Sequence, residues 1–161
     1  KIWWDLRPSS KFPTIESRIC DVAPRMEVTL MLAALTQCLT RMLWRKSVNG
    51  EGWRVVQNFM VAENRWRAQR YGVSEGLIDF GRKAIIPFPQ AVDEMIALVA
   101  EDAEALDCVA EVEAARDVLA DGTSADRQRI VYRDAIDAGV SHHAAMQSVV
   151  AALVADFQAD L

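Results

Sequence analysis

Apolar residues recur at helical spacing along most of the chain. The strongest run lies between residues 26 and 44, where apolar positions fall three or four apart, as they do on one face of a helix. Glu27, Gln37 and Arg41 interrupt this run, so it predicts a helix at the centre of a protein core and not a membrane span. Turn-forming residues at 47–52 separate it from the next helical segment.

The remaining sequence predicts further helices around one non-helical region. A second helix is expected over 53–71, ended by Gly72. Residues 73–90 hold two glycines and two prolines and are expected to form a loop or a small hairpin. Thr123 or Ser124 can cap the third of the later helices. These later helices are predicted over residues 90–106, 108–120, 124–138 and 141–158.

Two short segments within the first 22 residues have the composition of strands. Because side chains alternate between the two faces of a strand, Asp5 and Arg7 share one face of the first segment. Thr14, Glu16 and Arg18 share one face of the second segment. Acidic residues are depleted in strands, so a carboxylate flanked by arginines calls for a reason beyond packing.

The totals are those of an ordinary globular protein. The chain has 161 residues, 52% of them hydrophobic, which is enough for a single domain over 1–161 with a sizeable core. The formal net charge of -5 is spread unevenly. Residues 1–83 hold 14 Lys/Arg and 8 Asp/Glu, and residues 84–161 hold 4 and 15. The first part suits an anionic ligand, whereas the second is expected to form a solvated acidic layer of helices.

Other features of the sequence exclude several classes of site. Three cysteines without metal-ligand spacing indicate a reducing compartment, with cytoplasm as the expected location, and Cys20 is interpreted as a small sheet residue rather than a nucleophile. His142 and His143 are adjacent, so on a helix they cannot chelate one metal ion as an i, i+4 pair does. There is no glycine-rich phosphate loop. The basic first part lacks a dense Lys/Arg run, which leaves nucleic-acid binding as a weak third option.

Glu16 and Arg18 form the first candidate for chemistry. Two positions apart on a strand, their side chains point the same way, roughly 7 Å apart. A carboxylate can hold Mg²⁺ together with nucleotide phosphates, and a neighbouring guanidinium can bind phosphate oxygens and stabilise a transferring phosphoryl group. The alternative is a surface salt bridge on an exposed strand.

The second candidate lies in the predicted helix over 53–71. Asn64, Arg67 and Arg70 lie close together on it, beside Glu63, because residues three and four apart are neighbours on a helix. They could bind a carboxylate or a nucleotide phosphate. Alternatively, the arginines pair with Glu63 and with the acidic later helices. Trp66 lies on another face of the helix and is expected to pack inward.

These clusters resemble the C-terminal half of the glutamate-cysteine ligase type 2 family, the bacterial carboxylate-amine ligases. The resemblance covers roughly the first 75 residues, with its motifs in the family's order, and beyond them only a helical tail of suitable length. The matching segments are Trp4-Asp5-Leu6-Arg7-Pro8-Ser9, then Phe12-Pro13-Thr14-Ile15-Glu16-Ser17-Arg18 with Asp21, then Asn64-Arg65-Trp66 and Arg70-Tyr71-Gly72.

The resemblance implies an α+β fold like that of the glutamine synthetase and guanidino kinase catalytic domains, with a sheet that carries nucleotide and metals. It implies ATP- and Mg²⁺-dependent joining of glutamate to cysteine. By this likeness Glu16 is a metal ligand, Arg18 a phosphate contact, and Arg7 a further substrate or phosphate contact. Asn64, Arg67 and Arg70 carry over as ligand or support residues, and the nucleotide is their expected ligand.

The sequence departs from the family pattern in two places. Pro13 stands where the family usually has glycine, and Val22-Ala23-Pro24 replaces a tighter Asp-Thr-Pro turn. The family's other metal carboxylates and its histidine precede this segment. We therefore expect the chain to be the later part of a larger catalytic domain, whose opening strands pair with strands not present here, and to be inactive alone, because one carboxylate rarely holds two or more metal ions.

Three further expectations concern substrates and partners. The small-molecule substrates are glutamate and cysteine or another amine, with no membrane or nucleic-acid partner and with a homodimer as the expected assembly. One alternative keeps the fold but changes the substrate, giving a ligase for another amine or a kinase of a guanidino compound. The other alternative is a non-enzymatic helical domain whose basic first part binds an acidic partner.

Overall fold

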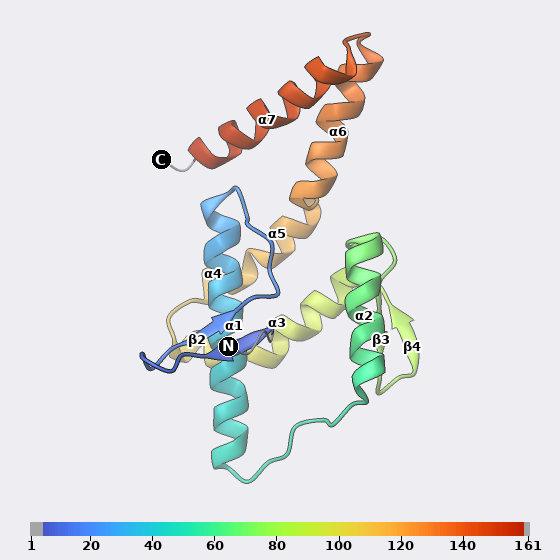
Figure 1. The fold of residues 1–161 in the computed structure, drawn as a ribbon. Coiled ribbons are helices and arrows are strands. Elements are labelled where there is room, and N and C mark those ends of the chain that lie inside the picture. The colour runs from blue at the N-terminus through green and yellow to red at the C-terminus, as the bar shows by residue number, and fades with distance from the viewer. Residues whose placement is uncertain (1–4, 160–161) are drawn as a thin grey trace.

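Helix α1, Met26–Val48, is the element around which much of the protein packs in the computed structural model, which describes residues 5–159 (Figure 1). Helices α3, Phe88–Ala105, and α4, Val109–Glu113, pack against it. Its buried positions recur at helical spacing, so the predicted central helix is confirmed. These positions are Met31, Ala34, Leu35, Cys38 and Met42.

The core lies between α1 and the α3–α4 segment. Val99 and Val112 are almost fully buried there, and burying a valine side chain stabilises the fold by about 1.5–3 kcal/mol. The remaining buried apolar residues of α3 and α4 and their flanking segments are Val92, Ile96, Ala103, Cys108 and Ala115.

None of the helices within the described residues combines the length and the apolar character that a membrane crossing needs.

One carboxylate is buried beside this core. Asp102 of α3 is 0% exposed, and its Oδ2 accepts a hydrogen bond of 2.9 Å from Nη2 of Arg45. Arg41 pairs with the other carboxylate oxygen. The hydrogen bond from Arg45, with that from Arg41, holds the pKa of Asp102 below its usual value despite burial. The later acidic helices were expected to form a solvated layer. One of their carboxylates, that of Asp102, is instead buried and links α3 to α1 through its ion pairs.

The two predicted strands at the start form an antiparallel hairpin. Strands β1, Leu6–Pro8, and β2, Ile15–Ser17, pair so that Arg7 lies opposite Glu16. Residues 1–4, including Trp3 and Trp4, lie outside the described part of the chain. The hairpin lies beside α1 (Figure 1).

Helix α2, Asn58–Tyr71, ends at Gly72 as predicted but begins five residues later than expected. Residues 53–57 precede it without helical structure, and they include two consecutive valines, which lose side-chain freedom in a helix. The inward packing expected for Trp66 is wrong: the residue is 49% exposed, and its ring meets Tyr71 edge to face. Helix α2 buries no residue completely and uses polar side chains to contact its neighbours.

A small hairpin follows α2, confirming the prediction for residues 73–90. It consists of β3, Leu77–Asp79, and β4, Ala84–Ile86, paired antiparallel. Gly76 just before β3 has φ +71°, and a Cβ there would lie 2.2 Å from the carbonyl oxygen of Ile86. Only glycine fits this close approach between the two strands.

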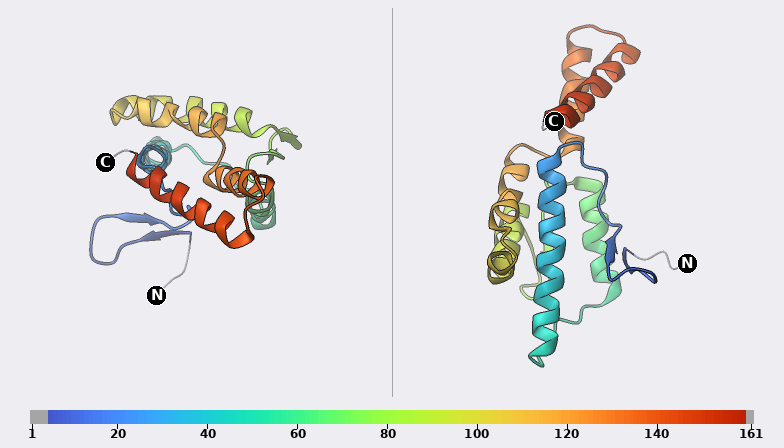
Figure 2. Two further views of the ribbon diagram at one scale, coloured as in Figure 1. Left: turned by 90° about the horizontal axis from the view of Figure 1, so that it is seen from above. Right: turned by 90° about the vertical axis from the view of Figure 1, so that its left-hand side faces the viewer.

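The predicted helix over 108–120 is two helices, α4 and α5, Ala115–Ala120, which meet at Ala114. Helix α6, Ser124–Asp137, begins with a capping box in which Thr123 and Asp126 exchange hydrogen bonds. Helix α7, His142–Gln158, is capped by Ser141. Helices α6 and α7 pack on each other and extend away from α1 (Figure 2).

The fold is thus α+β with two small antiparallel hairpins and predominantly helical structure, as predicted. The glutamine synthetase-like or guanidino kinase-like arrangement stays a prediction.

Candidate functional site

One face of the first hairpin gathers charged side chains, as the strand alternation predicts. Glu16 of β2 is bonded by Arg7 from the opposite strand and by Nη1 of Arg18, whose nitrogen lies 3.1 Å from Oε1. Each carboxylate oxygen therefore faces a different guanidinium. The side chain of Glu16 remains 46% exposed, so ligands and solvent can reach it.

Helix α2 contributes one more charge to this face. Nη1 of Arg65 lies 2.6 Å from Oδ2 of Asp5, which immediately precedes β1. The backbone of Asp5 also extends the hairpin ladder, because its carbonyl accepts a 2.7 Å hydrogen bond from the backbone N–H of Arg18. The structure thus brings together the two segments that are separate candidates in the sequence. We call this set, Asp5, Arg7, Glu16, Arg18 and Arg65, the charged face.

Arg65 is the residue that the sequence pattern did not single out. It lies within the second cluster, but helical spacing directs attention to Asn64, Arg67 and Arg70. The residue offered one signal: it lies in Asn64-Arg65-Trp66, one of the segments that carry the family resemblance. Its long side chain reaches across to Asp5, a contact that sequence spacing does not reveal.

Asn64 and Arg67 are occupied with holding the second hairpin. The carboxamide of Asn64 donates to the carbonyl of Ile78 at 2.9 Å and accepts from its N–H at 2.8 Å. The guanidinium of Arg67 donates to the carbonyls of Glu75 and Gly76 at 2.9 and 3.2 Å. These contacts correspond to the support role among the two roles predicted; a ligand contact of either residue stays a prediction.

Arg70 lies at the last turn of α2, where its guanidinium carbon is 6.0 Å from the ring centre of Tyr71. This position is near the limit for a cation–π contact. The predicted binding of a nucleotide by Arg70 also stays a prediction.

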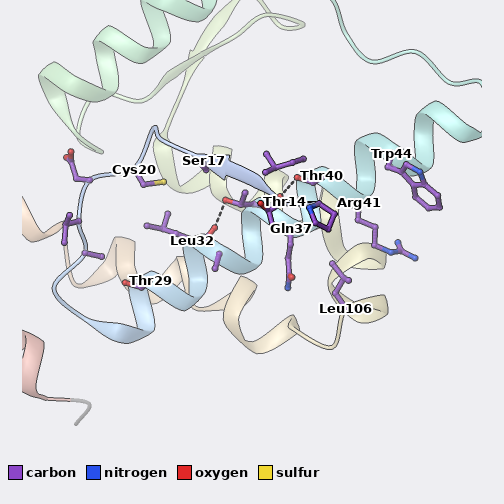
Figure 3. A pocket seen from close by; sticks show the side chains of 17 residues that line it. Thr14, Ser17, Cys20, Thr29, Leu32, Gln37, Thr40, Arg41, Trp44 and Leu106 are labelled. Atoms are coloured by element: carbon purple, nitrogen blue, oxygen red, sulfur yellow. Dashed lines mark hydrogen bonds between the residues drawn. The ribbon is translucent and has the colours of Figure 1, made fainter. Parts of the chain in front are cut away.

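The opposite face of the hairpin borders a wide groove against α1 (Figure 3). The groove has a volume of about 1040 Å³, and Ile15 and Ser17 line it, as do Gln37 and Arg41 of α1. Glu16 and Arg18 alternate with Ile15 and Ser17 along the strand and do not line the groove. Thr14, expected on the face of Glu16 and Arg18, does line it, because this residue precedes β2 and strand alternation does not extend to it. The charged face and the groove are two separate surfaces of one hairpin.

The charged face has the chemistry of a site for a metal-bound anion. Three arginines and two carboxylates give it a formal charge of +1, which favours phosphate or carboxylate groups. The carboxylate oxygens are hard donors suited to Mg²⁺, which is usually held by one or two carboxylates and by phosphates. Within residues 5–159, no three His, Cys, Asp or Glu side chains gather to hold a metal ion by themselves. A metal ion here would therefore need ligand oxygens from a phosphate or from other protein segments.

Comparison with known proteins identifies the family. The sequence model of Glutamate-cysteine ligase family 2 matches residues 1–152. This chain belongs to that family. The family match spans the charged face, α2 and most of the helical remainder, whereas the resemblance seen in the motifs ends near residue 75.

The relatives that match the chain over its whole length include three that each carry the name "Putative glutamate--cysteine ligase 2". They come from Jannaschia sp. (strain CCS1), at 62% identity, Paracoccus denitrificans (strain Pd 1222), at 49%, and Ruegeria pomeroyi (strain ATCC 700808 / DSM 15171 / DSS-3), at 50%. The chain covers 42%, 43% and 41% of these relatives, so it spans less than half of their length. No solved structure matches the chain.

Proposed function

We propose that this chain supplies part of the active site of an ATP-dependent carboxylate-amine ligase, with glutamate and cysteine as substrates. The observation that carries the proposal is the charged face, where Glu16 lies between Arg7 and Arg18 and where Arg65 of α2 joins through Asp5. Membership of the family and the names of the relatives support the ligase chemistry. A reducing, cytoplasmic location belongs to the same proposal, because one substrate is a thiol.

Each residue of the charged face has a role in the proposed reaction. Glu16 would hold Mg²⁺ through its carboxylate, and Arg18 and Arg7 would bind the phosphate oxygens of ATP and of the acyl phosphate formed from glutamate. When bound, Mg²⁺ would neutralise charge on those phosphates. Arg65, which holds Asp5 beside Arg18, would set the position of α2 relative to the hairpin.

This chemistry needs no nucleophilic side chain. The amine of the second substrate attacks the activated carboxylate, so the protein mainly positions the reactants and neutralises charge. Two guanidinium groups around one carboxylate can supply that environment. The absence of a motif for a catalytic serine or cysteine is therefore compatible with the proposal.

The test uses the full-length protein and compares neighbouring positions on β2. Replacing Glu16 by Gln or Arg18 by Ala should lower the rate of ADP release with glutamate and cysteine by about 100- to 1000-fold. The matched control is Ser17→Ala, which changes the residue between them on the face that borders the groove. The control should keep the wild-type rate.

The same variants separate the proposal from its alternatives. If the charged face is only a surface salt bridge, or if the domain binds an acidic protein, Glu16→Gln and Arg18→Ala will keep wild-type turnover and Mg²⁺–ATP affinity. That result would reject the proposed site. A screen of amines and guanidino compounds as second substrates distinguishes glutamate-cysteine ligation from the two related activities.

A further inference from the structure

Two cysteines from distant parts of the sequence meet inside the protein. The sulfur atoms of Cys38 and Cys108 lie 3.5 Å apart, although 70 positions separate the residues in the chain. Both are free thiols. Cys38 is 0% exposed and Cys108 is 7% exposed, so the pair lies within the core and outside the charged face.

The pair joins two structural elements at well-defined points. Cys38 lies in the middle of α1, and Cys108 is the residue from which α4 begins. The segment before Cys108 is a tight turn, because Asp107 has φ +53°. A covalent bond between these sulfurs would therefore fix α4 directly against α1.

The groove beside the hairpin comes within one side chain of this pair. Gln37 and Leu106 line the groove beside the hairpin, and Nε2 of Gln37 lies 3.5 Å from the sulfur of Cys108. Cys108 is also the more exposed of the two thiols. A small oxidant that reaches the pair would therefore meet Cys108 before Cys38.

The two thiols differ in how they can react. Burial, with the neighbouring Cys108 thiol, raises the pKa of Cys38 to about 12. Since the thiolate is the reactive form, Cys38 is inert toward external oxidants in the closed structure. It can nevertheless act as the second thiol, which attacks a sulfur already held next to it.

We propose that Cys38 and Cys108 form a reversible intramolecular disulfide when the protein meets a low-molecular-weight disulfide. The thiolate of Cys108 attacks one sulfur of that oxidant, which releases one thiol and leaves a mixed disulfide on Cys108. Cys38 then loses its proton to solvent, attacks the Cys108 sulfur and releases the second thiol. The protein loses two hydrogen atoms, and the disulfide bond of the oxidant is reduced to two thiols.

The two sulfurs would need to move only a short distance to form this bond. A disulfide requires sulfurs about 2.05 Å apart, so the pair must close by roughly 1.5 Å. Because the bond would close a long loop between α1 and α4, it restricts the unfolded chain and should raise the melting temperature by about 5–10 °C. Formation should be slow, because a buried pair reacts through local opening.

The test treats the full-length protein with oxidised glutathione and identifies the linked peptides after trypsin digestion without reduction. Cleavage after arginine and lysine places Cys38 in the peptide 26–41 and Cys108 in 84–116, with Cys20 in the separate peptide 19–25. We expect the first two peptides to become linked, with the mass of two hydrogens lost. Dithiothreitol should reverse the link and the rise in melting temperature.

Matched variants complete the experiment. Cys20→Ser should keep the linked peptides, because Cys20 is exposed and separate from the pair, whereas Cys108→Ser should abolish them. If Cys108→Ser does not fold, labelling of the wild-type protein decides: both buried thiols should lose reactivity toward an alkylating agent in parallel after oxidation and unfolding. Complete oxidation of Cys20 shows that the oxidant has acted. If Cys38 and Cys108 are then recovered as free thiols, or as two separate mixed disulfides, the proposal is overturned.

Discussion

Replacing Asp102 by Asn should destabilise the protein far more than an ordinary surface substitution. The change keeps the size of the side chain but removes the buried negative charge that pairs with Arg41 and Arg45. An amide offers one acceptor oxygen where the carboxylate offers two, so at least one of the three hydrogen bonds from the two guanidinium groups is lost. The substitution therefore weakens the buried ion-pair contact between α3 and α1.

The expected loss of stability depends on how deeply the carboxylate and the two guanidinium groups are buried. Breaking a fully buried ion pair by removing one partner costs about 3–5 kcal/mol. Asp102 is fully buried, but the side chains of Arg41 and Arg45 are 31% and 25% exposed. Solvent can therefore compensate part of the loss, and we expect Asp102→Asn to lower the free energy of unfolding by about 2–3 kcal/mol.

Urea denaturation at several pH values checks both the size and the origin of this effect. The arginines lower the pKa of Asp102 in the folded state, so its contribution is present above the unfolded pKa of about 3.9. It is lost as the pH falls through the lower folded pKa. The difference in stability between wild type and Asp102→Asn should therefore stay constant between about pH 5 and 8 and shrink in stronger acid.

The neighbouring residue provides a matched control. Glu101 also pairs with Arg45, at 3.1 Å, but its side chain is 66% exposed. Glu101→Gln should change the free energy of unfolding by less than about 0.5 kcal/mol. The reasoning is refuted if Asp102→Asn and Glu101→Gln destabilise equally at neutral pH, or if the effect of Asp102→Asn does not diminish in acid.

Four further substitutions test local features of the fold, each by urea or thermal denaturation. Asn64→Ala should cost about 1–2 kcal/mol, because both hydrogen bonds to β3 are lost; no loss would show that water replaces them fully. Thr123→Ala should cost about 1 kcal/mol by removing the cap of α6, and an unchanged stability would contradict that. Gly76→Ala should cost about 2–4 kcal/mol, because the new Cβ would clash with the backbone of Ile86. Its control is Gly50→Ala, at a position with positive φ but open space, which should cost about 1–2 kcal/mol. Equal losses for the two variants would show that the clash does not contribute.

The sequence predicts the helical elements well where periodic apolar residues and strong end signals coincide. Helix α1 is recognisable from its buried stripe, and the end of α2 from Gly72. The start of α2 is less predictable, because no capping residue marks Asn58. The division between α4 and α5 at Ala114 has no glycine or proline signal. Helices α4 and α5 both pack against α1, and a local pattern does not contain that contact.

The candidate site shows the same division between local and long-range information. The shared face of Glu16 and Arg18 is predictable from strand alternation alone, and the structure places both side chains there. The joining of Arg65 to Asp5 crosses 60 positions of sequence and depends on how α2 lies beside the hairpin. For the same reason the burial of Asp102 is not evident from an acidic segment, because both of its partners belong to α1.

The pairing of Asn64 with Ile78 has a consequence for self-association. A strand at the border of a sheet exposes backbone groups to which another molecule can add a strand, a common route to aggregation. The Asn64 carboxamide offers one donor and one acceptor to Ile78, as a peptide group of an adjoining strand would. A single side chain thus blocks the outer border of β3 at its midpoint, and the two-stranded unit is protected from growing by intermolecular strand addition there.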